Sequence, residues 1–314
     1  MALPAYATEQ LIENIKRRCS VPTSQLTYTD QDFTDLANDE LQGEVVPLMM
    51  SCREEYFVTY TDVSTVASGY IEFPADAIGA KLRSVCYYQD TQPLTLINLP
   101  RLDLDTISGV GYANLTNVVG FYIEGNNLCL YPNNAVPVGT QIRIYYYKRS
   151  LYLAAPLSYG QIVSIDTLNS QVVLDFVPAA WVAGTELNAV LSTPNFSLTS
   201  SAIEVVSVSS PTVTLNNVTG LSVGDYISER GYSAIPQVPI EAHAYLAQLT
   251  AAKCLEGLGD TQGMKNAMDK AMLLKDKLLV MVSNRVDGSG KKVLNPTGGL
   301  RIGAGMARRG WNIW

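Results

Sequence analysis

Charged side chains are scarce in this chain. They account for 16% of its 314 residues, while hydrophobic residues account for 47%; in an average globular protein about a quarter of the residues are charged. Interface cores are depleted of charge, so this composition favours a protein whose surface is covered by partner subunits. A β-rich protein with a surface of serine, threonine and asparagine has the same composition, and both interpretations stay open at this point. The length predicts two or three domains.

Histidine occurs only once, as His243. Ser/His/Asp or Cys/His catalysis would have to use it, no GxSxG elbow accompanies it, and a histidine-based metal site lacks further ligands. The pairs Asp30/Asp32 and Asp103/Asp105 keep carboxylate chemistry open, but such i, i+2 pairs are more often caps or solvated strand residues, and glycosidase chemistry needs a convergence that spacing does not show. We expect a core or interface histidine and no catalytic residue, metal, cofactor or enzymatic activity.

The five cysteines are scattered, and no CxxC pair occurs. Their spacing indicates neither a disulfide framework nor a zinc site. Cys86 and Cys129 stand in strand-like runs and are expected to be buried as small hydrophobes. The sequence contains no run of 18 apolar residues and no apolar signal core near Met1, so we expect a protein that is made in a reducing cytoplasm and has no membrane contact.

Charge is distributed unevenly along the chain. The segment from Arg285 onward carries six basic residues and one acid, a net charge of +5, which leaves −12 for the rest of a chain whose total is −7. The whole chain is therefore not held to nucleic acid by phosphate contacts. A basic, glycine-rich tail that ends in two tryptophans is typical of a segment that docks on a neighbouring subunit or partner. The residues expected to make this contact are Arg285, Lys291, Lys292, Arg301, Arg308, Arg309, Trp311 and Trp314.

Helical periodicity is confined to the two ends of the chain. A first helix is predicted from Thr8 or earlier, with Thr8 able to cap it, and Pro22 forbids its continuation. A second helix is predicted from residues 29–30, and Gly43 and Pro47 predict a kink or short break in it.

Two more helices are predicted after Pro239, whose ring suits a first helical turn. The first of them should be amphipathic and end at Gly257 or Gly259. A short loop makes the final helix its antiparallel neighbour, and that helix should end near Arg285. Its predicted apolar stripe consists of Met264, Ala267 or Met268, Ala271, Leu274, Leu278 and Met281.

From Phe57 to about Tyr232 the apolar period changes to two, which is typical of strands. The first part contains YIEF, KLRSVCYY, FYIEG, LCLYP and QIRIYYYKRS, with a hairpin expected at Gly125–Asn127. The run YYYK allows stacking on single-stranded nucleic acid, but a packed strand is the stronger interpretation. The second part contains IVSID, QVVLDF, ELNAVL, AIEVVSV, TVTL and DYIS, and its frequent turns, LxVGD at Leu221–Asp225 among them, predict a small barrel or sandwich.

Neither terminal helix pair has much to pack against alone. The expected fold class is therefore α+β, with a helical bundle formed by the N- and C-terminal helix pairs, an inserted antiparallel β region and an extended C-terminal tail. The predicted domains are a discontinuous bundle of residues 1–57 and 234–286, a first β segment of residues 58–152, a second β insertion of residues 153–233, and the basic tail of residues 287–314.

Several segments in combination resemble the head-to-tail adaptor, or connector, proteins of tailed bacteriophages. They are TYTDQDFTDLANDELQ, YIEFPADAIGAKLRSVCYY, LPRLDLD, GFYIEGNNLCLYPN leading to IRIYYYKRS, and IPQVPIEAHAYLAQLTAAKCLEGLGD with the final helix and its basic tail. The resemblance covers roughly residues 1–152 and 234–286, whereas residues 153–233 look like an extra insertion.

The resemblance implies a structural virion protein without catalytic residues, assembled in the host cytoplasm. Such adaptors resemble one another in packing side by side as a homo-oligomeric ring, usually a dodecamer, at the head–tail junction. The ring attaches to the portal above and to a tail or nozzle protein below, and DNA passes through its lumen without sequence-specific binding. An acidic body suits that task because a negative wall repels phosphate.

The alternative is a tail or receptor-binding structural protein that uses residues 153–233 as a sugar- or protein-binding module. A ring-sized native mass would favour the adaptor, and a trimer would favour the alternative. A depolymerase or peptidoglycan hydrolase is disfavoured because no acid/base constellation stands out in the sequence.

Overall fold

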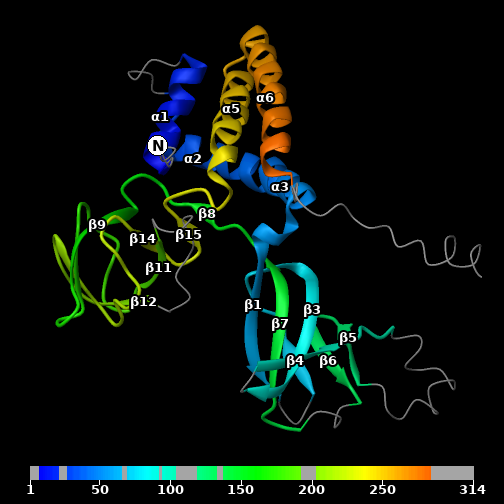
Figure 1. The fold of residues 1–314 in the computed structure, drawn as a ribbon. Coiled ribbons are helices and arrows are strands. Elements are labelled where there is room, and N and C mark those ends of the chain that lie inside the picture. The colour runs from blue at the N-terminus through cyan, green and yellow to red at the C-terminus, as the bar shows by residue number, and fades with distance from the viewer. Residues whose placement is uncertain are drawn as a thin grey trace, which may run out of the picture. The chain divides into compact units, whose positions relative to one another are not determined.

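The computed structural model describes residues 7–20, 27–65, 69–91, 94–103, 119–132, 137–191 and 203–283. Its helices come from the two ends of this sequence and its strands from the middle (Figure 1). All described strand pairs but one run antiparallel. The fold class is therefore α+β with antiparallel sheets, as the sequence predicts.

The first helix, α1 (Thr8–Cys19), begins where it is predicted to begin but is capped differently. Ala7 holds the N-cap position, and the Thr8 hydroxyl donates a hydrogen bond to the carbonyl oxygen of Ala234 at 3.1 Å. The Thr8 backbone N–H donates to the same oxygen at 2.8 Å. The predicted capping role of Thr8 is wrong, because a carbonyl 226 residues further along the chain accepts its hydroxyl proton.

The second helix, α2 (Asp30–Glu40), starts with a capping box formed by Thr29 and Asp32. The Thr29 hydroxyl accepts a hydrogen bond from the Asp32 N–H at 3.2 Å, and the Asp32 carboxylate accepts one from the Thr29 N–H at 2.7 Å. These reciprocal bonds satisfy donors that the first turn of a helix leaves open, which explains why the predicted start is correct.

The predicted interruption after α2 is confirmed as a change of helix type. A π-helical turn (Leu41–Val45) leads into α3 (Val46–Cys52), and a 3₁₀ turn (Glu54–Phe57) follows. Pro47 has no N–H to donate to the carbonyl of Gly43, so the α-helical ladder cannot continue unchanged through this point.

Helix α5 (Ile240–Gly257) lies against α1, α2 and α6 (Thr261–Val282). It buries twelve residues, with the polar His243, Gln248 and Thr250 among them. The sequence predicts an amphipathic helix here, and this is wrong because neighbouring helices cover α5 on more than one side. Helices from both ends of the described chain share one apolar core around it.

One face of α6 is buried, through Ala267, Ala271, Leu278 and Val282. The predicted stripe is thus correct except at its end, where Val282 takes the place expected for Met281, and the helix ends at Val282. The large apolar side chains that α6 leaves exposed are Met268, Met272, Leu273, Val280 and Met281.

The first β region forms a four-stranded and a three-stranded sheet. In order across the first sheet, the strands are β1 (Val58–Ser64), β7 (Gln141–Lys148), β3 (Ala77–Thr91) and β4 (Leu94–Leu99). Across the second they are β2 (Tyr70–Glu72), β6 (Asn127–Tyr131) and β5 (Gly120–Glu124). The two sheets share an apolar core that includes Phe121, Leu128 and Ile144.

The predicted hairpin between β5 and β6 is confirmed. Glu124 pairs with Asn127, so Gly125 and Asn126 form a two-residue turn. Gly125 has a φ of 59°, and a glycine with positive φ at the first central position is the signature of a type II′ turn.

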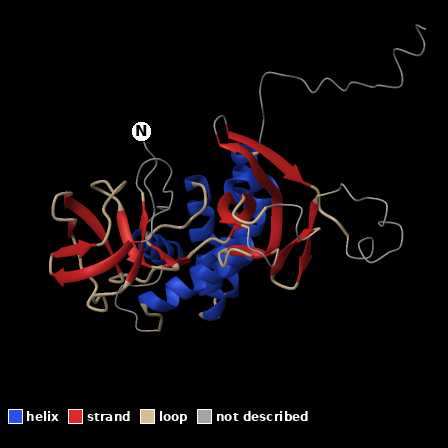
Figure 2. Ribbon diagram, turned by 90° about the horizontal axis from the view of Figure 1, so that it is seen from below, coloured by secondary structure: helices blue, strands red, loops and turns tan. Residues whose placement is uncertain are grey.

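The second β region closes into a six-stranded barrel, one of the two arrangements that the sequence leaves open (Figures 1 and 2). In order around the barrel, the strands are β10 (Gln171–Leu174), β13 (Thr212–Leu215), β12 (Ile203–Ser209), β11 (Glu186–Val190), β14 (Tyr226–Glu229) and β9 (Tyr159–Asp166). Alternate side chains point into a core that contains Trp181 and Val213. The predicted turn at Leu221–Asp225 leads into β14, where Ser222 N–H donates to the Asp225 carboxylate at 2.7 Å.

Two short strands, β8 (Tyr152–Leu153) and β15 (Tyr232–Ser233), pair in parallel at the entry to and exit from the barrel sequence. The Leu153 N–H also donates to the Asn38 side-chain oxygen of α2 at 2.7 Å. The barrel sequence is therefore tied to the helical core at the point where it leaves and rejoins the rest of the chain.

Candidate functional site

The residues predicted to dock on a partner lie outside the described residues, so their contacts stay predictions. They are Arg285, Lys291, Lys292, Arg301, Arg308, Arg309, Trp311 and Trp314. The candidate site is therefore built from the side chains that the structure does describe.

His243 is a core residue. Its Nε2 lies 3.2 Å from the carbonyl oxygens of Pro236 and Val238, to which it donates. Burial disfavours the charged ring and lowers the pKa of His243 to about 4, although the two carbonyls partly oppose this. The ring is neutral at pH 7 and holds the segment that leads into α5, so the prediction of a core histidine is confirmed.

Of the two acidic pairs, Asp30/Asp32 lies at the start of α2 and stabilises it. The capping hydrogen bonds from Thr29 lower the pKa of Asp32, and Asp30 forms an ion pair with Lys16. Asp103 is described, whereas Asp105 lies outside the described residues. Asp30 and Asp32 therefore stabilise the start of a helix, which is the interpretation that the sequence favours.

Cys86 and Cys129 are buried as expected, and all five cysteines are free thiols. Among the described side chains, no group of three or more His, Cys, Asp or Glu residues is arranged to hold a metal ion. Within the ranges that the structure covers, no helix combines the length and the apolarity needed to cross a membrane.

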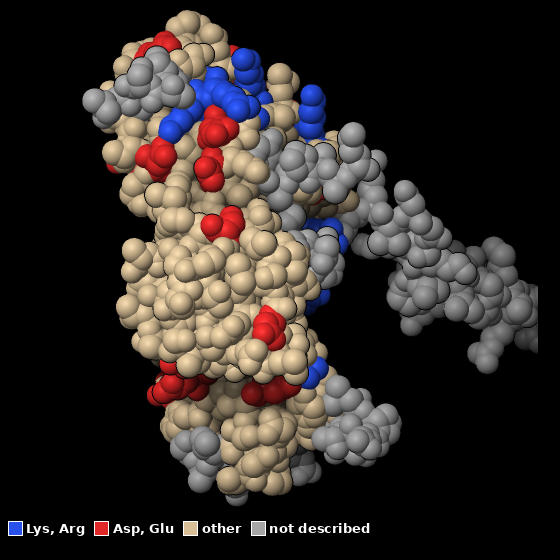
Figure 3. Space-filling model, turned by 90° about the vertical axis from the view of Figure 1, so that its left-hand side faces the viewer, with Lys and Arg blue, Asp and Glu red and all other residues tan. Residues whose placement is uncertain are grey.

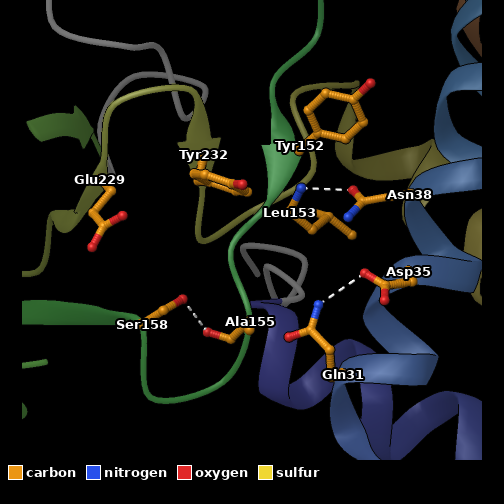
Figure 4. Close-up of a pocket in the computed structure, with 9 residues that line it drawn as sticks. All are labelled: Gln31, Asp35, Asn38, Tyr152, Leu153, Ala155, Ser158, Glu229 and Tyr232. Atoms are coloured by element: carbon orange, nitrogen blue, oxygen red, sulfur yellow. Dashed lines mark hydrogen bonds between the residues drawn. The ribbon is translucent and has the colours of Figure 1, made fainter. Parts of the chain in front are cut away.

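A cavity of about 400 Å³ opens between α2 and the strands at the entry and exit of the barrel (Figure 4). Its size falls in the range of roughly 300–1,000 Å³ typical of ligand-binding clefts. The residues that line it are Gln31, Asp35 and Asn38 of α2, Tyr152, Leu153, Ala155 and Ser158 around β8, and Glu229 and Tyr232 at β14 and β15.

Hydrogen bonds hold the walls of this cavity in place. The Gln31 amide donates to the Asp35 carboxylate at 2.8 Å, and the Ser158 hydroxyl donates to the Ala155 carbonyl at 2.5 Å (Figure 4). The buried Asn38 side chain binds the β8 backbone. A cavity with walls ordered in this way can receive a ligand at a low entropic cost.

The cavity is acidic and aromatic. Asp35 and Glu229 are its two charged residues, and no lysine or arginine is among the nine described residues that line it. Tyr152 and Tyr232 are register partners on β8 and β15, and their side chains are 50% and 47% exposed. Carboxylates beside tyrosine rings favour a cation with an apolar stem, such as arginine or lysine.

A strained turn stands beside the cavity. Ser158 N–H donates to the Ala155 carbonyl at 3.1 Å, Pro156 is the second residue of the turn, and Leu157 is the third with a φ of 66°. This is the arrangement of a type II turn, which favours glycine at the third position. A leucine there costs about 1–2 kcal/mol, and its side chain is 72% exposed.

A second ordered surface lies on the outer face of the β1–β7–β3 sheet. Arg143 donates to the Asp62 carboxylate at 2.8 and 2.9 Å, and its guanidinium carbon lies 3.9 Å from the ring centre of Tyr60. The Arg143 hydrogen bonds hold the pKa of Asp62 below its ordinary value. Tyr145 packs beside Tyr60 at 5.8 Å between ring centres.

The rest of the tyrosine run is buried. Tyr146 lies in the core of the β sheets and Tyr147 in the core of the helices. The packed-strand interpretation of this run is therefore confirmed for both residues.

The cavity is a candidate site that sequence reasoning missed. β8 and β15 have two residues each, too few for a periodicity of two to be recognised. Pro156 does indicate a turn, but the positive φ of Leu157 is visible only in the structure.

The fold and the site define an α+β protein with a cavity and exposed apolar side chains. Its described polar residues mainly form caps, turns and ion pairs, while tyrosine and aliphatic side chains stand exposed. The chain belongs to the SU10 adaptor protein family, whose family model it matches over residues 8–185, more than half of its length. A search of curated proteins finds no match.

Membership of this family supports part of what the resemblance to adaptor proteins implies. It indicates a structural protein of the phage adaptor type, and it suggests a non-enzyme that resides in the virion. The match includes α1 to α3, the first β region and the start of the barrel. It does not extend over residues 186–314, which include the second helical region covered by the resemblance.

Proposed function

We propose that this chain is a subunit of the adaptor ring at the head–tail junction of a tailed phage. The ring attaches to the portal on one side and to a tail or nozzle protein on the other. The family match over residues 8–185 carries this proposal, and the charge-poor composition supports it because subunit interfaces are depleted of charge.

The helices form the body of the proposed ring. Residues 1–57 and 234–286 are the bundle that packs side by side in twelve copies. The support is the outer face of α6, where Met272, Leu273 and Val280 stand exposed on a helix whose opposite face is already buried. Exposed apolar side chains gathered on one element mark interaction sites in soluble proteins.

DNA passes through the ring without being held. Before Arg285 the chain carries a net charge of −12. A wall of this sign repels phosphate and lets a duplex slide, whereas basic patches would retain it by releasing counterions.

The barrel, which the insertion of residues 153–233 forms, faces a protein partner. Residues 150–229 contain six acidic residues and no lysine or arginine. In Figure 3, which faces the side where Figure 1 draws the barrel, a broad area carries few charges. Leu168 is 94% exposed at the β9–β10 turn, where Asp166 accepts hydrogen bonds from the Leu168 and Asn169 N–H groups.

This exposed tip also supports the second candidate function, a tail or receptor-binding protein that uses the barrel as its binding module. A leucine presented on an ordered turn is suited to enter an apolar pocket of another protein. In that case the helical core would serve as an anchor.

The basic tail completes the proposal. Its docking residues Arg285, Lys291, Lys292, Arg301, Arg308, Arg309, Trp311 and Trp314 bind an acidic surface of a neighbouring subunit or of the portal. Arginine and tryptophan are the residue types most enriched at the centres of interfaces.

Native mass spectrometry combined with electron microscopy tests the function. The purified chain, alone and mixed with portal protein, is expected to give closed rings of about twelve copies, the number usual for the adaptors it resembles. A trimer would support the fibre or receptor-binding alternative. A chain that stays monomeric at high concentration in both samples would contradict both proposals.

A further inference from the structure

We infer that the cavity between α2 and the barrel is the receptor for the C-terminal segment, residues 284–314, of a neighbouring copy of this chain. The inference rests on the proposed function, because it needs identical copies side by side. It adds the place where the tail binds and the side chains that recognise it.

The charges of the two surfaces are complementary. Asp35 and Glu229 line the cavity without a described basic neighbour among the lining residues. Asp35 accepts one hydrogen bond from Gln31, and both of its oxygens retain further capacity to accept. The segment from Arg285 onward carries a net charge of +5, so it is attracted to this site and is the most basic part of the chain.

The tyrosine side chains of the cavity are also suited to bind the C-terminal segment. Tyr152 and Tyr232 stand half exposed as partners on the β8–β15 pair. A guanidinium over a tyrosine ring gains a cation–π interaction that a neutral side chain lacks. The tail offers Arg308 and Arg309 next to an aromatic end in the sequence ARRGWNIW.

The strained turn explains the apolar part of the contact. Leu157 keeps a backbone conformation that favours glycine, and its side chain is 72% exposed instead of packed in the core. Folding gains little from such a residue, so an observed outlier of this kind points to a role in binding. Leu157 belongs to the turn whose first and last residues, Ala155 and Ser158, line the cavity, and we expect it to pack against a tryptophan of the tail.

The tail is long enough to reach another copy. The described chain ends at residue 283, and 31 residues follow. Fully extended, a segment of that length spans at most about 100 Å. This exceeds the size of a single domain, so the distance to an adjacent subunit does not exclude the contact.

Photo-crosslinking between two isotopic forms of the full chain tests the inference. In the light form a benzoylphenylalanine replaces Trp314, and the heavy form is unchanged. Irradiation of the mixed assembly is expected to join position 314 to heavy peptides that contain residues 31–38, 152–158 or 229–232. Heavy cross-links that all fall outside these segments, or cross-links confined to a single chain, would overturn the inference.

Charge variants separate recognition from folding. The double variant Asp35→Asn with Glu229→Gln is expected to lower the yield of these cross-links roughly fivefold at low salt, because two partly exposed ion pairs are lost. The matched control, Glu72→Gln with Glu124→Gln, removes the same charge from exposed positions of β2 and β5 and should leave the yield unchanged. Equal loss in both variants would show a general charge effect and refute a specific site.

Exchanging the charges of the cavity and the tail should restore a contact that a single substitution weakens. Asp35→Lys alone should weaken the contact, and combining it with Arg308→Glu and Arg309→Glu in the tail should restore a large part of the cross-link yield. Failure of this rescue, with both variants folded, would argue against contact between these groups.

Leu157→Gly distinguishes binding from stability. The substitution removes the strain, so the unfolding midpoint should rise or stay unchanged, while the cross-link yield falls. A purely structural role predicts the reverse, with a lower midpoint and an unchanged yield.

Native mass measured on the same samples keeps the two proposals apart. Rings whose tails cross-link elsewhere would overturn the cavity as receptor and leave the adaptor ring intact. A monomer without light–heavy cross-links would overturn both.

Discussion

His243 carries no charge at neutral pH because it is buried among backbone and apolar groups. Its Nε2–H donates to two carbonyls of the segment before α5, so the side chain holds that segment in place. The same holds for Asp32, whose carboxylate is occupied by the start of α2. His243 and Asp32 are thus used for folding.

The buried histidine predicts a dependence of stability on pH. The pKa of His243 is lowered from 6.5 to about 4 in the folded protein. Between these values the unfolded chain binds a proton that the folded chain does not, so stability should fall as the pH drops from 6.5 to 4, by roughly 3 kcal/mol. Urea unfolding of the wild type and of His243→Gln checks this, because the variant should lack that part of the slope. Parallel pH profiles would contradict it.

Gly160 predicts a destabilising substitution in the barrel. An added Cβ would lie 2.2 Å from the carbonyl oxygen of Phe176, a backbone atom that cannot move away freely. Gly160→Ala should therefore cost about 1–3 kcal/mol of unfolding free energy. Gly43→Ala is the matched control, since no atom lies within 4 Å of the added Cβ there. Thermal unfolding of both variants checks the difference, and equal midpoints would refute it.

The stability of helix α2 depends on the capping box at its first turn. Its side chains alternate between the core and the cavity, so its register also places Asp35 and Asn38. Thr29→Ala removes the hydroxyl of the capping box and should lower stability by about 1 kcal/mol. Thr29→Ser keeps the hydroxyl and should restore most of this loss. Chemical denaturation measures both, and an unchanged Thr29→Ala variant would show that the cap contributes nothing.

Helix α6 differs from the others in the apolar side chains it leaves exposed. Met272→Lys with Leu273→Lys should prevent subunit association without lowering the unfolding midpoint, because neither side chain is buried within the chain. The control Ser207→Lys with Ser209→Lys adds the same charge at exposed polar positions of β12, outside α6. Sedimentation velocity compares them, and normal assembly of the first variant would exclude this face from the interface.

For the molecule as a whole, charge is divided between an acidic body and a basic tail. Deleting residues 287–314 changes the net charge of the chain from −7 to −11, because the removed segment contains five basic residues and one acid. The truncated protein should fold with an unchanged midpoint, since the segment is glycine-rich and lacks apolar periodicity, and should lose subunit or portal binding. Binding and assembly that survive the deletion would refute the docking role of the tail.

Much of the architecture was accessible from local patterns. The start of α2 follows from Thr29 and Asp32, the β5–β6 turn from Gly125, and the break before α3 from Pro47, because each of these residues acts on the backbone within a few positions. The α+β class and the antiparallel strands follow from the change of period between the ends and the middle of the chain.

Other features depend on contacts between segments far apart in the chain. Thr8 is held by Ala234 and not by its own helix, and α5 is buried on several sides because helices from both ends of the described chain surround it. The cavity exists because β8 and β15 pair across the whole barrel sequence and bring Glu229 and Tyr232 opposite α2. Local periodicity carries no information about such pairings, because they are selected by the packing of the complete chain.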